Sequence, residues 1–292
     1  MSIATLAAER REVPSSTPTA PLSVIVLTFN EERNLPACLT SLQGLNAAVW
    51  VLDSGSTDDT LAVATSFGAR TVHHSFENYA AQRNWSLANL PIGTEWVLNL
   101  DADERLTPEL VAEINQLLAG QTRADGYLLR KRTVFLGRWI RHGGHYPSYH
   151  LRLFKRTRGR CEDRQYDQHF VVDGHTGSLT NDYIDVVSTS LTSWSARHVR
   201  WAEMERDELM RSTHTSGQVV ADVSGDPIQR RRWWRNTYAR GPLFVRALAY
   251  WVYRYFFRLG FLDGTEGLIF HFLQGFWFRF LVDSLIYERR RT

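Results

Sequence analysis

The chain has 292 residues, of which 43% are hydrophobic, and a formal net charge of +3. This length can bury a sizeable core in one or two domains, and the modest charge argues against a general nucleic-acid-binding protein, so no nucleic acid is expected as a partner. Only two cysteines occur, Cys38 and Cys161, which excludes a disulfide framework or a cysteine-based zinc site and fits a reducing cytoplasm. We interpret residues 1–20, rich in Ser, Thr, Pro and Ala, as a disordered lead.

Strand-like and helical segments alternate after Pro21. The continuous apolar run LSVIVLTF is typical of a strand buried on both faces of a parallel sheet, and it ends at Asn30. Further strands are predicted at 47–52, 69–74 and 95–100, with helices within 31–45, from Ser56 and over 78–90. This alternation predicts an α/β fold with a mostly parallel sheet flanked by helices.

Polar clusters follow three of these strands. They are Thr28 to Glu31, Asp53, and Asp101 to Glu104. Because ligands of parallel α/β sheets bind at the carboxyl ends of the strands, we expect the three clusters to converge on one crevice.

Several common motifs are missing. The first strand leads into TFNEERN rather than GxGxxG, and neither GxxxxGK[ST], GxSxG nor HExxH occurs. A dinucleotide-dependent oxidoreductase or a P-loop nucleotidase is therefore not expected.

The stretch DADE contains two carboxylates one residue apart, Asp101 and Asp103. Such a pair offers hard oxygen ligands to Mg²⁺ or Mn²⁺, which usually completes its shell with water and phosphate oxygens. The alternative is helix capping, with Thr107 as N-cap and Pro108 in the first turn. Capping does not account for Asp101 and Asp103, so we favour the metal.

In combination, the motifs SVIVLTFNEERN, VLDSGSTDDT and LNLDADE resemble the nucleotide-binding half of a family 2 glycosyltransferase with the GT-A fold. The resemblance covers residues 21–200 and is greatest to bacterial enzymes of lipopolysaccharide-core and exopolysaccharide assembly. It implies a UDP- or GDP-sugar donor and a DxD metal motif at Asp101 and Asp103. The nucleotide of the donor would be held by Thr28, Asn30, Glu31 and Asp53.

The resemblance also implies inverting transfer, in which a carboxylate takes the proton of the acceptor hydroxyl. We choose Asp167 as this base, ahead of Asp163 and His169, with a polar surface position as the alternative. Arg83 and Arg152 could contact the donor, although a solvated helix face and an ordinary strand explain them as well. The expected acceptor is a lipid-linked glycan. A polyprenyl-phosphate acceptor and a non-catalytic glycan-binding or scaffold protein remain alternatives.

The last quarter of the chain is rich in arginine and aromatic residues. Arg246, Tyr250, Arg254 and Arg258 recur every four residues, which predicts a helix with a basic face. Because a spanning helix tolerates such charges poorly, we expect helices lying in the lipid headgroup region, with arginines reaching the phosphates. A hairpin packed on the catalytic domain or on a second copy in a homo-oligomer is the alternative.

The predicted organisation has four parts. Residues 1–20 form the lead, 21–121 the nucleotide-sugar-binding half, 122–200 the acceptor-side half, and 201–292 a membrane-associating helical region. The expected location is the cytoplasmic face of the bacterial cell membrane, with the protein peripheral to it.

Overall fold

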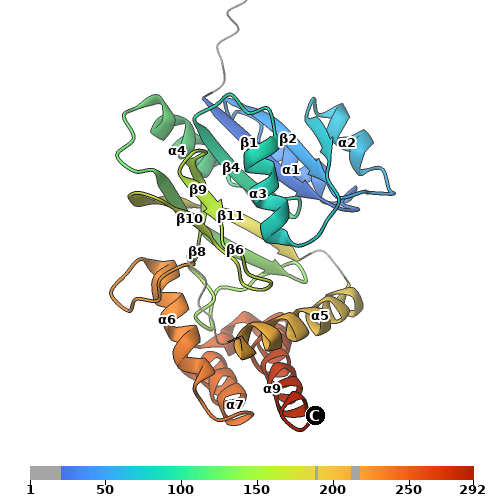
Figure 1. Cartoon of the computed structure of the whole chain (residues 1–292), viewed down its shortest axis with the longest axis vertical. Helices are drawn as coiled ribbons and strands as arrows, with labels where there is room; N and C mark the ends of the chain where they lie inside the picture. Colours follow the sequence, from blue (N-terminus) through green and yellow to red (C-terminus); the bar gives the residue numbers. More distant parts are fainter. Residues whose placement is uncertain (1–20, 188–189, 212–217) are drawn as a thin grey trace, which may run out of the picture.

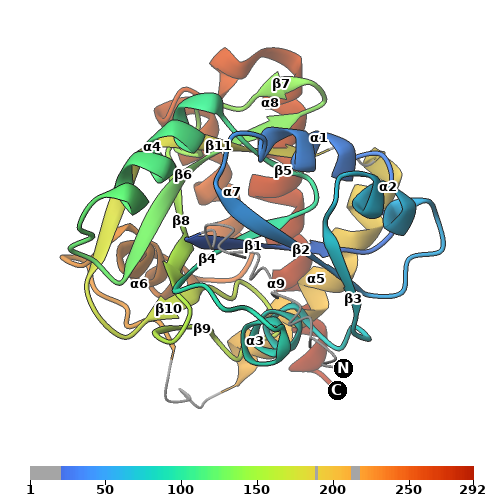
Figure 2. The ribbon, with the colours of Figure 1, turned by 90° about the horizontal axis from the view of Figure 1, so that it is seen from above.

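The computed structural model describes residues 21–187, 190–211 and 218–292 (Figure 1). The predicted disordered lead lies outside these residues. A central sheet carries helices on both faces, and a second, helical layer lies beyond one edge of the sheet (Figures 1 and 2). The predicted fold class, an α/β sheet flanked by helices with a C-terminal helical region, is confirmed.

The main sheet has the strand order β3-β2-β1-β4-β8-β6-β11-β5, with β7 paired to β6. Its strands are β1 Leu22–Thr28, β2 Ala47–Asp53, β3 Arg70–His73, β4 Trp96–Asp101, β5 Glu104–Leu106, β6 Gly126–Phe135, β7 Arg138–Trp139, β8 Ser148–Lys155 and β11 Thr176–Val187. A separate two-stranded sheet pairs β9 Gly159–Cys161 with β10 Phe170–Val172.

The first half of the sheet is parallel, because β1 pairs with β2 and β4, and β2 with β3. Beyond β4 the sheet is mixed: β8 is antiparallel to β4 and β6, and β6 is parallel to β11. Strands β1, β4, β6 and β11 therefore point in one direction. Their C-terminal ends lie together at one end of the sheet, which we call the carboxyl edge.

Helices cover both faces of the sheet (Figure 2). On one face lie α1 Leu35–Ser41, α2 Thr60–Ser66 and α4 Pro108–Ala119, packed on a core of apolar side chains from β1 and β4. The other face carries α3 Tyr79–Asn89 together with β9 and β10. The capping prediction for α4 is confirmed, since the Thr107 hydroxyl accepts a hydrogen bond from the Leu110 amide and Pro108 opens the helix.

The helical layer, called the C-terminal layer below, lies beyond the carboxyl edge (Figure 1). Its elements are α5 Leu191–Met210, α6 Pro227–Ala239, α7 Val245–Val252, η1 Tyr253–Phe257, η2 Gly260–Asp263, α8 Gly264–Phe270, η3 His271–Trp277 and α9 Phe278–Arg289. Phe135, at the end of β6, packs in one core cluster with Trp194 of α5 and Phe270 of α8. The carboxyl edge is therefore in contact with the C-terminal layer.

Two arginines of the predicted basic stripe face inward, whereas Arg258 is exposed. Arg246 and Arg254 are only 7% and 6% exposed, and the predicted contact of this stripe with lipid phosphates is wrong for both. Arg246 pairs with the buried Asp283, and Arg254 donates to the carbonyl of Gly143 in the β7–β8 loop. The reason is that a buried guanidinium needs an acceptor, which the folded chain supplies.

Large apolar side chains of the same layer are exposed instead. They are Leu248, Tyr253, Phe256, Phe257, Leu259, Phe261, Leu262, Leu268, Phe272 and Phe280. Among the described residues, one helical stretch, Gly260–Arg289, is long and apolar enough to cross a membrane by length and composition, and 39% of its most apolar window is buried.

Candidate active site

Asp53 links the end of β1 to the loop after β2. Its carboxylate accepts hydrogen bonds from the amides of Gly55 at 2.8 Å and Ser56 at 2.9 Å and from the Thr28 hydroxyl at 3.2 Å. The Ser56 hydroxyl also donates to it, so its four acceptor positions are filled within the chain. A direct bond from a nucleotide to Asp53 would have to replace one of these contacts.

The loop after β1 is fixed in the same way. Asn30 has a left-handed backbone (φ 55°), and its side-chain oxygen accepts from the Thr57 amide at 2.8 Å. The backbone amide of Asn30 donates to the Ser56 hydroxyl at 2.9 Å. Next to it, burial raises the pKa of Glu31, and the carboxylate of Asp101 is among the charges that raise it further. The polar clusters after β1 and β4 are thus neighbours, as predicted.

Two arginines hold Asp101 at the end of β4. Nη2 of Arg83, on α3, lies 3.1 Å from both carboxylate oxygens, and Nη2 of Arg152, on β8, lies 3.1 Å from Oδ2. Burial opposes ionisation of Asp101, but Arg83 and Arg152 outweigh it and hold its pKa below the usual range. Both arginines therefore lie beside Asp101, and both form an ion pair with it.

Glu104, whose role the sequence left open, begins β5 and is 3% exposed. Its carboxylate accepts from the Asp101 amide at 2.9 Å and forms an ion pair with Arg152. Burial raises the pKa of Glu104 to about 7, since the favourable charge of Arg152 is offset by the negative charges of Asp101 and Asp185. Glu104 thus supports the loop that carries the two aspartates.

Asp103 lies among several carboxylates. Burial raises its pKa well above the usual range, and the largest charge effect comes from Asp185 of β11, followed by Asp101. Asp185 lies opposite Glu104 in the β11–β5 register and pairs with Nζ of Lys131 at 2.7 Å. The sequence analysis missed Asp185 and Lys131, because strand pairings far apart in the chain bring them here.

The side chains of Asp101 and Asp103 fit a divalent cation that is bound mainly by one carboxylate, that of Asp103. The negative charge gathered around Asp103 is what such a cation neutralises, whereas Asp101 already accepts three hydrogen bonds and has one acceptor position left. Within the described residues no group of three or more His, Cys, Asp or Glu side chains is placed to hold a metal. Mg²⁺ does not require one, since it usually takes one or two carboxylates and completes its shell with water and substrate phosphates.

Asp167, the predicted base, lies in the loop between β9 and β10 with a left-handed backbone (φ 54°). Its carboxylate is 3.6 Å from Nε2 of His169, 3.5 Å from Arg231 and 3.6 Å from Arg235. Burial opposes ionisation, but Arg231, His169 and Arg235 keep the pKa of Asp167 well below its usual value. Asp163, on the same loop, is exposed.

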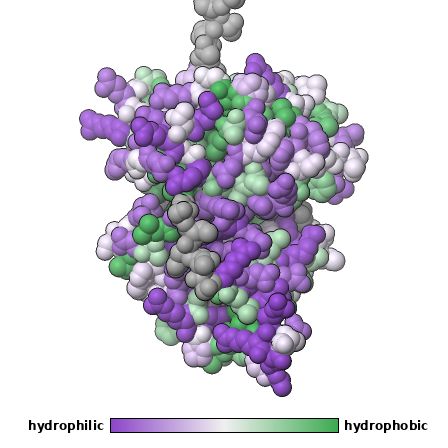
Figure 3. All heavy atoms as spheres, in the orientation of Figure 1, coloured by the Kyte–Doolittle hydropathy of each residue, from purple (hydrophilic) through white to green (hydrophobic). Residues whose placement is uncertain are grey.

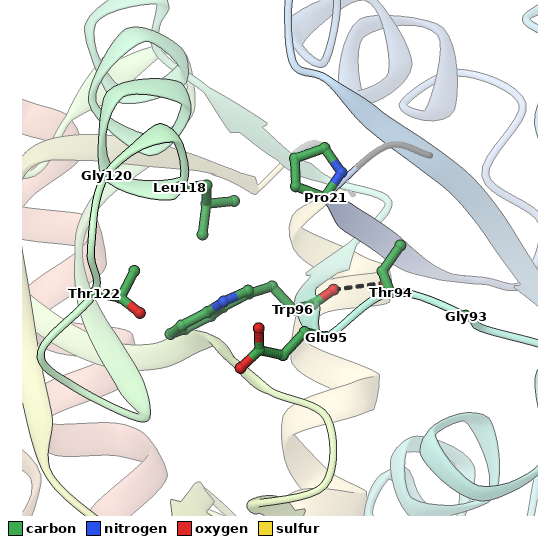
Figure 4. Close-up of a pocket in the computed structure, with 8 residues that line it drawn as sticks. All are labelled: Pro21, Gly93, Thr94, Glu95, Trp96, Leu118, Gly120 and Thr122. Atoms are coloured by element: carbon green, nitrogen blue, oxygen red, sulfur yellow. Dashed lines mark hydrogen bonds between the residues drawn. The ribbon is translucent and has the colours of Figure 1, made fainter. Parts of the chain in front are cut away.

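A pocket of ≈ 330 Å³ lies at the opposite edge of the sheet, where β1 and β4 begin (Figure 4). It is lined by Pro21, Gly93, Thr94, Glu95, Trp96, Leu118, Gly120 and Thr122. None of the candidate site residues lines it, so it is separate from the carboxylate cluster.

Comparison with known protein families gives one assignment. The family described as Glycosyl transferase family 2 matches residues 23–180, more than half of the chain. The matched range contains all the predicted site residues and the newly found Lys131, but it ends before Asp185.

Individual relatives differ in how much of the chain they cover. The lipopolysaccharide core biosynthesis glycosyltransferase LpsC of Rhizobium meliloti is 26% identical over 279 residues, which is 93% of this chain and 94% of that protein. The uncharacterized glycosyltransferase RC0292 of Rickettsia conorii is 37% identical over 110 residues, 38% of each chain.

Among solved structures, S. aureus TarS 1-349 in complex with UDP-GlcNAc is 15% identical, covering 92% of this chain and 91% of that one, with a TM-score of 0.47. Glucosyl-3-phosphoglycerate synthase from Mycobacterium tuberculosis, in complex with Mn²⁺ and UDP, is 26% identical over 39% of this chain and 44% of that one, with a TM-score of 0.32. TM-scores this low carry no argument about the present site.

Proposed function

The chain belongs to glycosyl transferase family 2, and we propose that it is an inverting, metal-dependent enzyme that moves a sugar from a nucleotide-diphosphate donor to a lipid-linked glycan. The observation that carries this proposal is the pairing of β1 with β4, in which Leu27 lies opposite Asp101, so that the loop with Glu31 and the turn with Asp103 follow neighbouring strand ends. The similarity to LpsC over 93% of the chain supports a role in lipopolysaccharide or other cell-surface polysaccharide synthesis.

The donor is a UDP- or GDP-sugar whose nucleotide lies against the two loops after β1 and β2. Thr28 and Asp53 fix these loops to each other, and Asn30 and Glu31 present their side chains from the first of them. A binding surface held by internal hydrogen bonds loses little conformational freedom when the donor binds.

Asp103 and the remaining acceptor position of Asp101 would hold Mg²⁺ or Mn²⁺. Such a cation supplies a Lewis acid that neutralises the departing diphosphate. Arg83 and Arg152 keep Asp101 ionised, and Glu104 holds Arg152 in place. The carboxylate of Asp101 is therefore ionised before the donor binds.

In the transfer step the acceptor hydroxyl oxygen forms a bond to the anomeric carbon on the face opposite the diphosphate. The bond from that carbon to the diphosphate oxygen breaks, and the hydroxyl proton passes to the carboxylate of Asp167. Arg231, His169 and Arg235 keep Asp167 ionised, which is the state that a base requires, and the same positive charges lower its affinity for the proton. His169 is the alternative base.

The C-terminal layer is proposed to place the enzyme on the cytoplasmic face of the cell membrane. Most of its exposed large apolar residues lie on α7, η1, η2, α8, η3 and α9, elements that contact one another in sequence order. Soluble proteins rarely expose so many large apolar side chains without a membrane or protein partner. His271 and Asp283 of the Gly260–Arg289 stretch are fully buried, which favours a layer lying on the membrane over a single spanning helix.

The test measures release of nucleoside diphosphate from a panel of UDP- and GDP-sugars with Mn²⁺ and bacterial envelope lipid. Wild-type protein should turn over one donor preferentially, EDTA should abolish the release, and NMR of the product should show the inverted anomer. Asp103→Asn should lose turnover with an unchanged unfolding midpoint. Asp173→Asn, which removes an exposed carboxylate paired with Arg160, is the matched control. Full turnover in Asp103→Asn or in EDTA would exclude the metal role.

A further inference from the structure

Arginines of the C-terminal layer gather around the phenol ring of Tyr250 on α7. The guanidinium carbon of Arg254 lies 5.4 Å from the ring centroid, and that of Arg279 lies 5.9 Å from it. Burial opposes ionisation of this phenol, yet Arg254, Arg279 and Arg231 together lower its pKa. Arg235 of α6 and Arg279 of α9 both lie 3.1 Å from Glu205, so three elements, α6, η1 and α9, bring a cation to this region.

Arg254 has no acidic partner. It is 6% exposed, and no Asp or Glu among the described residues forms an ion pair with it. Its Nε donates to the Gly143 carbonyl at 2.8 Å, while its buried Nη2 has no hydrogen-bond partner in the part of the chain that the structure describes. Because a buried guanidinium normally has an anionic or carbonyl acceptor for each terminal nitrogen, the free Nη2 indicates a position for an anion.

The local charge is positive. The arginine cluster, as we call it, consists of Arg231, Arg235, Arg254 and Arg279. Arg231 and Arg235 share Asp167, and Arg235 and Arg279 share the buried Glu205. Three guanidinium groups therefore share two carboxylates, and the fourth, Arg254, pairs with no carboxylate of the described residues. Arg231, with half of its side chain exposed, is accessible to a ligand.

A continuous series of contacts joins the arginine cluster to the carboxylates of the active site. Between nitrogen and oxygen atoms, Asp167 lies 3.5 Å from Arg231 and 3.6 Å from His169, and Arg152 lies 3.1 Å from Asp101. Between ring centroids, His150 lies 5.9 Å from His169 and 6.4 Å from Tyr183. The guanidinium carbon of Arg152 lies 5.9 Å from the centroid of the Tyr183 ring. In this series Asp167 stands between the arginine cluster and Asp101. Hydrophilic side chains predominate on the face of the molecule shown in Figure 3.

We infer that the arginine cluster binds a phosphate group of the acceptor, through Arg231, Arg254 and Arg279. This inference rests on the proposed function, since it concerns the acceptor side of the same crevice. Guanidinium groups suit phosphate because their planar donors match its oxygens in pairs. Asp167 would then lie between the bound phosphate and the sugar donor.

The phosphate has two sources, a polyprenyl phosphate lipid or a phosphorylated sugar of the glycan. Farnesyl phosphate represents the first and glucose 6-phosphate the second, with farnesol and glucose as uncharged controls. Binding of each to the full chain is measured by isothermal titration calorimetry in EDTA, so that the proposed metal site does not contribute. Binding of UDP with Mn²⁺ is measured in parallel.

Arg231→Gln is the principal variant, and Arg254→Gln is the second. Arg240→Gln removes an exposed arginine at the end of the same helix as Arg231 and serves as the matched control. We expect the wild type and Arg240→Gln to bind one of the phosphates and neither uncharged control. Arg231→Gln and Arg254→Gln should each weaken this binding by about tenfold. The preferred phosphate identifies the source.

UDP binding with Mn²⁺ should be unchanged in all three variants and lost in Asp103→Asn, whereas Asp103→Asn should still bind the phosphate. Failure of wild-type protein to bind either phosphate while it binds UDP would overturn the inference and leave the proposed function intact. Equal phosphate binding by Arg231→Gln, Arg254→Gln and wild type would also overturn it. Phosphate binding without any binding of nucleotide would instead contradict the proposed function.

Discussion

Arg246 of α7 and Asp283 of α9 form an ion pair inside the C-terminal layer, with side chains 6% and 1% exposed. Asp283 also accepts from the Phe244 amide at 2.7 Å, so one carboxylate fixes the start of α7 to α9. The layer thus buries this ion pair, while large apolar side chains on α7 to α9 are exposed.

Breaking this pair should destabilise the protein strongly. Arg246→Met leaves a buried, unpaired carboxylate, and we expect a loss of about 3–5 kcal/mol in the free energy of unfolding. The double variant Arg246→Met/Asp283→Leu should regain most of it, since no buried charge remains. Urea denaturation measures the free energy of unfolding of the single and the double variant, with the exposed Arg289→Met as control. A single variant as stable as wild type would show that the pair is not formed in solution.

Removing Arg83 should impair the metal-dependent step without unfolding the chain. Arg83→Met deprives Asp101 of one of the two cations that keep it ionised, and we expect a 10- to 100-fold lower activity, as is typical for residues that orient metal ligands. The Mn²⁺ concentration for half-maximal turnover should rise. Arg70→Met on the edge strand β3 should have neither effect. An unchanged Mn²⁺ requirement in Arg83→Met would exclude this positioning role.

The base assignment is tested on the β9–β10 loop. Asp167→Asn should lower transfer to a hydroxyl acceptor by about 10²- to 10⁴-fold, because the proton has no carboxylate to accept it. Asp163→Asn, on the same loop but exposed, should be nearly neutral. Transfer should be measured in quenched, single-turnover reactions. The opposite result, in which His169→Gln loses activity and Asp167→Asn retains it, would assign the base to His169.

The exposed apolar side chains should bind membranes. Phe256 and Phe257 are 51% and 75% exposed, and burying one such ring in lipid contributes about 1.5–3 kcal/mol, or roughly tenfold or more in affinity. Phe257→Ser should therefore reduce flotation with vesicles of anionic phospholipid by about tenfold, and the double variant Phe256→Ser/Phe257→Ser further. Phe67→Ser on α2, also exposed, is the control. Equal flotation of all variants would assign these side chains to another partner.

Stability should fall as the pH decreases from about 6.5 to about 4, in part because of His198. This ring stacks on Trp194 at 3.4 Å and is 3% exposed, and burial lowers its pKa from 6.5 to about 4. In this interval the unfolded chain binds a proton that the folded chain excludes, so the loss approaches about 3 kcal/mol. Above pH 6.5 His198 contributes no pH dependence.

His198→Phe removes this proton uptake. The free energy of unfolding, measured by urea denaturation at about pH 7 and about pH 5, should differ less in the variant than in wild type. Other buried histidines, such as His150 and His169, have lowered pKa values too, so part of the decrease should persist. An identical decrease in variant and wild type would contradict the assignment to His198.

The sequence alone determined the elements and the first part of the site. Strand β1, the helix cap at Thr107 and the convergence of the cluster around Glu31 with Asp101 follow from local patterns, since burial of an apolar run and the end of a parallel strand are properties of short segments. It also named Arg83 and Arg152 as candidates for donor contact, with a solvated helix face and an ordinary strand as alternatives, and the structure places both beside Asp101.

Only the tertiary structure decided which groups surround those residues. Asp185 and Lys131 reach the site through the pairing of β11 with β5 and β6, which no spacing in the sequence encodes. The same holds for the arginine stripe: its period of four predicted a basic helix face, but not whether that face meets lipid or protein. A buried guanidinium is stable only where the fold supplies acceptors, so the contacts of Arg246 with Asp283 and of Arg254 with Gly143 hold these two arginines inside the protein.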